Sequence, residues 1–94
     1  MRLYEGLLIF RPDLEKEEVE KLTQNFEELI QKQGGKIVEK LDWGVKRFAY
    51  PIKKLEEGYY TIFTFESPSE GIEKLKRAFQ RDERVIRNLI FRKK

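Results

Sequence analysis

Two segments of this chain each carry a single narrow apolar stripe at helical spacing, and strand-like segments flank both of them. The first helical segment runs from Asp13 to Gln33, and the second ends near Arg81. A helix with one apolar stripe can bury only one side, so the two helices need a common surface to cover. The stripes consist of Val19, Leu22, Phe26, Leu29 and Ile30 in the first helix, and of Ile72, Leu75 and Phe79 in the second. This pattern favours two helices on one face of a single sheet.

Both helices have start signals in the sequence. Asp13 is predicted to be the N-cap of the first helix, and Gly34-Gly35 supplies its C-terminal stop. Ser67-Pro68-Ser69-Glu70 has the form of a capping box, with Pro68 at the first helical position. We therefore expect the second helix to begin directly after this box.

The remaining apolar segments have the composition of strands. They cover Arg2–Phe10, Lys36–Ile52, Tyr59–Phe65 and Val85–Phe91. The order βαββαβ predicts an α+β, ferredoxin-like sandwich with a four-stranded antiparallel sheet and two helices on one face. Residues 1–94 form a single domain in this interpretation. In the third strand the two aromatic sets alternate, and we expect Tyr60 with Ile62 to face the core.

The second strand is longer than a helix of this fold can cover. Lys36–Tyr50 would span about 50 Å as a strand, whereas the first helix covers only about 28 Å. The long second-strand hairpin, closed by a connection at residues 53–58, must therefore extend beyond the helices. Gly44 is expected to bend this strand, and Pro51 places the strand at a sheet edge because proline cannot donate to a ladder. An exposed hairpin with apolar residues predicts a partner that covers it.

The composition argues against most enzymatic chemistry. The chain has 94 residues, no Cys and no His, so thiolate nucleophiles, the usual transition-metal ligands and the common proton shuttle are missing. We expect no metal and no other cofactor. The longest apolar run, Leu7–Phe10, is too short for a membrane span, and we expect a cytoplasmic protein.

Two enzymatic alternatives rest on particular residues. Paired carboxylates such as Glu27-Glu28 and Glu56-Glu57 fall on helix faces or turns, where nothing indicates the burial that tunes a pKa. Acylphosphatases share the fold and use an early glycine-bearing loop with an anion-binding arginine. The corresponding turn here, at residues 10–14, contains Arg11 but no glycine. We therefore expect no enzyme activity.

Charge is distributed unevenly along the chain. Residues 13–32 carry seven acids and three bases, for a net −4, whereas residues 74–94 carry nine bases and two acids, for a net +7. An acidic helix beside a basic end is consistent with an oriented contact to a polyanion or with a solvated charged surface. The third strand lacks the basic-Gly-aromatic-Gly signature of RNA-recognition motifs, so contact with an RNA backbone is favoured over base stacking.

Several motifs resemble one protein family across essentially the whole chain. They are Arg2-Leu3-Tyr4-Glu5, Gly44-Val45-Lys46-Arg47-Phe48-Ala49-Tyr50-Pro51-Ile52, Gly58-Tyr59-Tyr60 and Val85-Ile86-Arg87. The chain resembles bacterial ribosomal protein six of the small subunit. The resemblance implies a structural, non-catalytic constituent of the small ribosomal subunit, which takes part in translation. It also implies that the chain binds the central domain of 16S ribosomal RNA together with small-subunit protein eighteen during platform assembly.

The resemblance also suggests site residues. The candidate RNA contacts are Arg2, Tyr4, Arg47, Arg81, Arg84, Arg87 and Arg92. The candidate contacts to the partner protein are Lys46, Arg47, Tyr50 and Pro51 in the hairpin, where Phe48 and Ala49 are expected to pack rather than to bind. The alternative is a ferredoxin-like protein-interaction or regulatory module without RNA binding.

Overall fold

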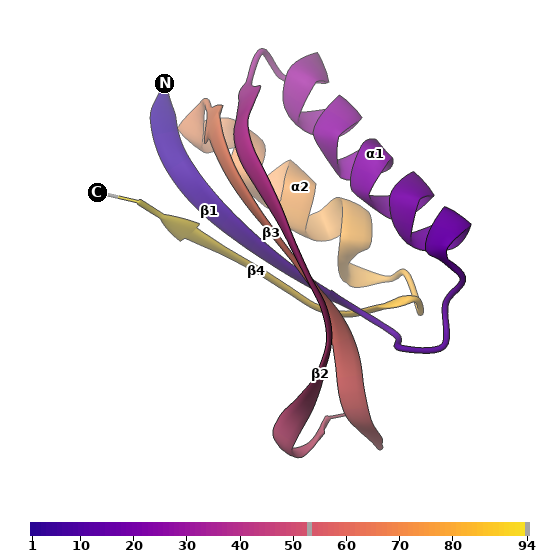
Figure 1. The fold of residues 1–94 in the computed structure, drawn as a ribbon. Helices are drawn as coiled ribbons and strands as arrows, with labels where there is room; N and C mark the ends of the chain where they lie inside the picture. The colour runs from indigo at the N-terminus through magenta and orange to yellow at the C-terminus, as the bar shows by residue number, and fades with distance from the viewer. Residues whose placement is uncertain (53, 94) are drawn as a thin grey trace.

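The helices and strands follow one another in the predicted order. The computed structural model describes residues 1–52 and 54–93. Its elements are β1 (Arg2–Phe10), α1 (Lys16–Lys32), β2 (Lys36–Ile52), β3 (Leu55–Ser67), a short 3-10 helix η1 (Ser69–Gly71), α2 (Ile72–Gln80) and β4 (Val85–Arg92). The strands form one antiparallel sheet in the order β2-β3-β1-β4. Figure 1 shows both helices on the same side of this sheet. The ferredoxin-like sandwich is therefore confirmed.

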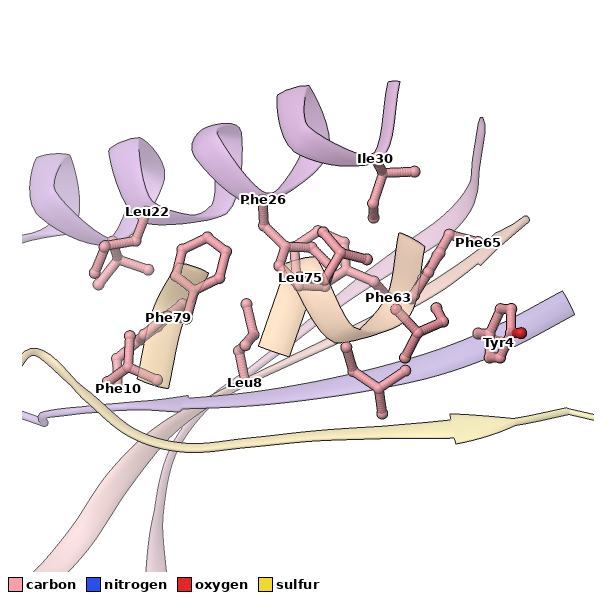
Figure 2. Close-up of a cluster of buried hydrophobic side chains, with 14 residues drawn as sticks. Tyr4, Leu8, Phe10, Leu22, Phe26, Ile30, Phe63, Phe65, Leu75 and Phe79 are labelled. Atoms are coloured by element: carbon pink, nitrogen blue, oxygen red, sulfur yellow. The ribbon is translucent and has the colours of Figure 1, made fainter. Parts of the chain in front are cut away.

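The core lies between the helices and the sheet and is centred on aromatic rings (Figure 2). Phe26 of α1 lies 4.8 Å from Phe63 of β3 and 5.4 Å from Phe79 of α2, measured between ring centroids. Gly6 of β1 lies below this cluster, and a Cβ atom there would approach the ring of Phe65 to 3.3 Å. The small residue in β1 thus allows the large rings to pack directly on the sheet.

The prediction for the faces of β3 is wrong. Phe63 and Phe65 are fully buried under the helices, whereas Tyr60 and Ile62 face the opposite side of the sheet. Successive strand residues point to opposite faces, and this strand is apolar on both. The alternation therefore could not tell which set meets the helices; the register of β3 beside Gly6 of β1 decides it.

Both predicted helix starts are also wrong. The helix α1 begins at Lys16 after Glu15, and the carboxylate of Asp13 instead accepts a hydrogen bond from Arg11 Nε at 3.3 Å. Ser67 is the buried last residue of β3, and its hydroxyl donates to the Pro68 carbonyl at 3.0 Å. The turn η1 then separates Ser67 from α2, so the four residues do not form a capping box.

The long hairpin is confirmed, and it is longer than predicted. The strand β2 has 17 residues, and β3 begins at Leu55 rather than at Tyr59. Ile52 pairs with Leu55, which leaves Lys54 in the turn with a positive φ of 66°; Lys53, also predicted in the connection, lies outside the described residues. Gly44 has a φ of +75° where the register shifts, which confirms the bend. The strand β2 is an edge strand, as Pro51 predicted.

Candidate nucleic-acid and protein interface

The basic end of the chain does not form one cluster. Arg87 of β4 lies opposite Ile9 and points away from the helices, whereas Arg92 lies opposite Tyr4 on the helix side of the sheet. Arg2 begins β1 opposite Ser67, at the same end of the sheet as Arg92. Both faces of the sheet and the loop with Arg81 therefore carry exposed arginines. Lys94, which the sequence places in the basic end, lies outside the described residues.

Arg84 is engaged within the chain. Its Nε donates to Asp82 Oδ1 at 3.0 Å and its terminal nitrogen to Oδ2 at 2.8 Å. The backbone N–H of Arg84 also donates to Asp82 Oδ1 at 3.0 Å. These hydrogen bonds lower the pKa of Asp82 and raise the pKa of Arg84. Such a bidentate ion pair fixes the loop between α2 and β4 and leaves Arg84 less able to contact a phosphate.

Tyr4, one of the candidate RNA contacts, is buried in the core. Only 6% of its surface is accessible, and its ring stacks on Phe65 with 5.8 Å between centroids. The cause is the register of β1, in which Tyr4 falls on the same face as Leu8 and Phe10 under the helices. Tyr4 therefore does not offer the open ring face that stacking on a base requires.

The hairpin exposes all four of the residues predicted to bind a partner. Tyr50 is 69% exposed, and Lys46 and Pro51 are also exposed. Arg47 forms a solvent-exposed ion pair with Glu56 at 3.7 Å, a contact that contributes little to stability and leaves the guanidinium accessible. Lys46 lies over the ring of Trp43, with Nζ 5.4 Å from the centroid.

Phe48 and Ala49 behave differently from each other. Phe48 is half-buried, and its ring lies 6.1 Å from that of Tyr60. A Cβ atom on Gly58 would come within 2.7 Å of the Phe48 ring, so glycine is needed for this packing. Ala49 is exposed. Packing is therefore confirmed for Phe48, whereas the prediction for Ala49 is wrong.

The sheet face opposite the helices carries an apolar belt that the sequence reasoning missed. Leu7 lies opposite Leu89 on one side and Ile62 on the other, and Ile62 lies opposite Leu41. Leu89, Leu41 and the neighbouring Phe91 are 37%, 44% and 58% exposed. We call these five residues the apolar belt. No described helix or strand lies over it (Figure 1). The run Leu7–Phe10, apolar on both faces of its strand, was the available signal.

Neither a metal-binding group of side chains nor a membrane-spanning helix is found among the described residues. They contain no group of acidic side chains that could hold a metal ion. None of the helices within 1–52 and 54–93 is long and apolar enough to cross a membrane. What the chain presents is exposed arginines and an uncovered apolar sheet face, which suit contacts with large molecules.

Comparisons with known proteins agree with this geometry. The family model described as Ribosomal protein S6 matches residues 3–92. The small ribosomal subunit protein bS6 of Carboxydothermus hydrogenoformans is 36% identical over 98% of this chain and 96% of its own length. That of Thermosynechococcus vestitus is 41% identical over 92% of this chain and 75% of its own length.

A solved structure is similar over the same extent. The crystal structure of 30S ribosomal protein S6 from Thermotoga maritima superimposes with a TM-score of 0.93 and 32% identity. The match covers 98% of this chain and 87% of the crystallised one. Sequence and fold thus point to the same family.

Proposed function

The chain belongs to the ribosomal protein S6 family, and from this premise we propose that it binds the central domain of 16S ribosomal RNA together with small-subunit protein eighteen. As a member of that family it is a structural, non-enzymatic component of the small ribosomal subunit. It therefore takes part in translation and associates with ribosomal RNA and ribosomal proteins. The proposal specifies the RNA domain that is bound, the partner protein and the residues that make the contacts.

Exposed arginines support the RNA part of the proposal. Arg2, Arg81, Arg87 and Arg92 are exposed, and within the described part of the chain none of them forms an ion pair. A guanidinium without an internal partner can pair with a phosphate through two parallel hydrogen bonds. Arg84 is bound to Asp82, and Tyr4 is buried, so we assign neither of them to the main RNA contact.

The apolar belt is the single observation that best supports a protein partner. It crosses all four strands and continues beside Tyr60 and Phe48 into the hairpin. A ribosomal protein that covers the belt would remove exposed leucine and phenylalanine side chains from water. We propose that protein eighteen docks there and reaches the hairpin residues Lys46, Arg47, Tyr50 and Pro51.

The proposal is tested by measuring binding to a transcribed central-domain fragment of 16S ribosomal RNA, with and without protein eighteen. We expect retention of the RNA when both proteins are present. Affinity should fall with salt, with a slope of roughly −0.7 to −0.9 per phosphate neutralised. Retention of protein eighteen without any RNA would instead favour a protein-interaction module. Binding that does not change with salt would contradict the phosphate contacts.

A further inference from the structure

A basic surface cavity lies where α2 meets the first half of β4. It has a volume of about 380 Å³, and its lining includes the cationic residues Lys76, Arg77 and Arg87. Glu73 is the one acidic residue that lines it. None of the three cations forms an ion pair with another described residue. The cavity therefore has an excess of positive charge that the described chain does not neutralise.

A second cavity adjoins the first at Arg77 and Gln80, which line both. Its volume is about 440 Å³, and it is lined by Arg77, Gln80 and Arg81. Arg81 is the C-cap residue of α2 and follows Arg77 by four residues, so the two lie about one helical turn apart. Arg77 thus borders both cavities, and Arg81 lines the second one beside it.

We propose that these two cavities bind neighbouring phosphates of an RNA backbone, with Arg77 between them. This inference rests on the proposed function and adds to it a residue, Arg77, that neither the motifs nor the family comparison points to. Its physical basis is a pair of guanidinium groups, that of Arg77 at both cavities and that of Arg81 at the second. Each of them can present parallel donors to phosphate oxygens, which suits a chain of phosphates better than a single ion.

The contrast with Arg84 strengthens the assignment. Arg84 lies between Arg81 and Arg87 in the sequence, yet its guanidinium is held by both carboxylate oxygens of Asp82. Arg77 is exposed and has no such carboxylate among the described residues. Of the two, Arg77 is the one that can reach a phosphate without first breaking an internal pair.

A structural role of Arg77 in α2 must be separated from RNA binding by the test. Arg77 lies in the last turn of α2, where a positive charge interacts favourably with the helix dipole. That role predicts a small loss of thermal stability when the charge is removed and no change in RNA affinity. Binding and stability must therefore be measured on the same variants.

The experiment compares Arg77→Ala and Arg77→Gln with the unaltered chain in the presence of protein eighteen and the central-domain RNA fragment. Lys21→Ala is the matched control, because it removes one exposed positive charge from the other helix. We expect each Arg77 variant to bind about tenfold more weakly, the loss of one charged hydrogen-bonded contact. The salt slope should become shallower by about 0.7 to 1.8, corresponding to one or two phosphates.

The control should retain both affinity and slope. If the unaltered chain binds the RNA but the Arg77 variants match the control, this inference is wrong and the proposed function stands. If the unaltered chain does not bind the RNA, both fail. Circular dichroism melts decide the remaining case, in which Arg77→Ala loses both the fold and RNA binding. The inference then stands if the Arg77→Gln variant stays folded and still loses RNA binding, and it is wrong if the folded Arg77→Gln variant binds normally.

Discussion

Asp42 joins the two strands at the root of the hairpin through two side-chain hydrogen bonds. It accepts from the Tyr59 hydroxyl at 2.8 Å and from the Thr61 hydroxyl at 3.1 Å. Burial, together with the hydrogen bond and the negative charge of Asp42, raises the pKa of Tyr59 to about 12. These contacts lie directly before the register shift at Gly44, so they fix the point from which the hairpin leaves the sheet.

Replacing Tyr59 with phenylalanine should lower the free energy of unfolding by about 0.5–1.5 kcal/mol at neutral pH, the net value of one hydrogen bond. The pKa of Tyr59 is higher in the folded chain than its ordinary value of 10.0. Its contribution is therefore complete below pH 10 and is lost as the pH rises towards 12. Urea unfolding of both proteins at pH 7 and at pH 10–12 measures this.

The difference in stability between the two proteins should shrink over that alkaline range. A constant difference would show that the hydroxyl does not titrate with folding. Tyr50→Phe is the matched control, since Tyr50 is 69% exposed and its hydroxyl accepts or donates no described side-chain hydrogen bond.

At the scale of elements, the loop between α2 and β4 decides where the edge strand begins. Asp82 holds Arg84 by its side chain, and its carbonyl accepts from the Val85 N–H at 3.0 Å. The carbonyl of Arg84 in turn accepts from the Arg11 N–H at 2.9 Å. One carboxylate thus organises the residues that lead β4 into the sheet beside β1.

Replacing Asp82 with asparagine should destabilise the chain by about 1 kcal/mol, a modest value because the pair is partly exposed to solvent. The pKa of Asp82 is lower in the folded chain than its ordinary 3.8. Its contribution is therefore present above pH 3.8 and is lost as the pH falls below that value. Thermal melts at pH 7 and pH 3 would measure it.

The wild-type and Asp82→Asn proteins should melt further apart at pH 7 than at pH 3. Equal separation at both pH values would mean that the charge of Asp82 does not contribute. Asp13→Asn is a suitable control, because the pair of Asp13 with Arg11 is more exposed and involves one hydrogen bond at 3.3 Å.

At the scale of the whole molecule, the two faces of the sheet differ in what covers them. The helices cover one face, and the aromatic core fills the space between them (Figure 2). The other face carries the apolar belt, and the hairpin extends beyond the helices from the same sheet (Figure 1). A sheet with one face covered by its own helices and an exposed apolar belt on the other face is suited to assembly into a larger particle.

Replacing Phe91 with serine should weaken binding of protein eighteen by about tenfold without unfolding the chain, because an exposed aromatic anchor is lost from the belt. Val38→Ser is the matched control: Val38 is 54% exposed against 58% for Phe91, and it is not a belt residue. Isothermal titration calorimetry gives both affinities. Equal affinities for the two variants would place the partner elsewhere.

Much of the fold could be predicted because it depends on local patterns. The apolar stripe through Phe26 and the strand-like runs beside it required helices and strands in that order. Gly44 and Pro51 indicated a bend and a sheet edge through their own backbone geometry. The predictions of the helix starts were wrong because Asp13 and Ser67 form hydrogen bonds with nearer partners, Arg11 and the Pro68 carbonyl.

The sequence by itself determined the element order, the fold class, the overhanging hairpin and the family, since each rests on residue spacing along the chain. Only the tertiary structure decided which side of each strand is buried. It placed Tyr4 in the core, engaged Arg84 with Asp82 and left Arg77 beside two cavities. The physical reason is that β1 and β3 are apolar on both faces. The orientation of these two strands is fixed by contacts between strands and helices that are far apart in the sequence. The local spacing of residues carries no information about such contacts.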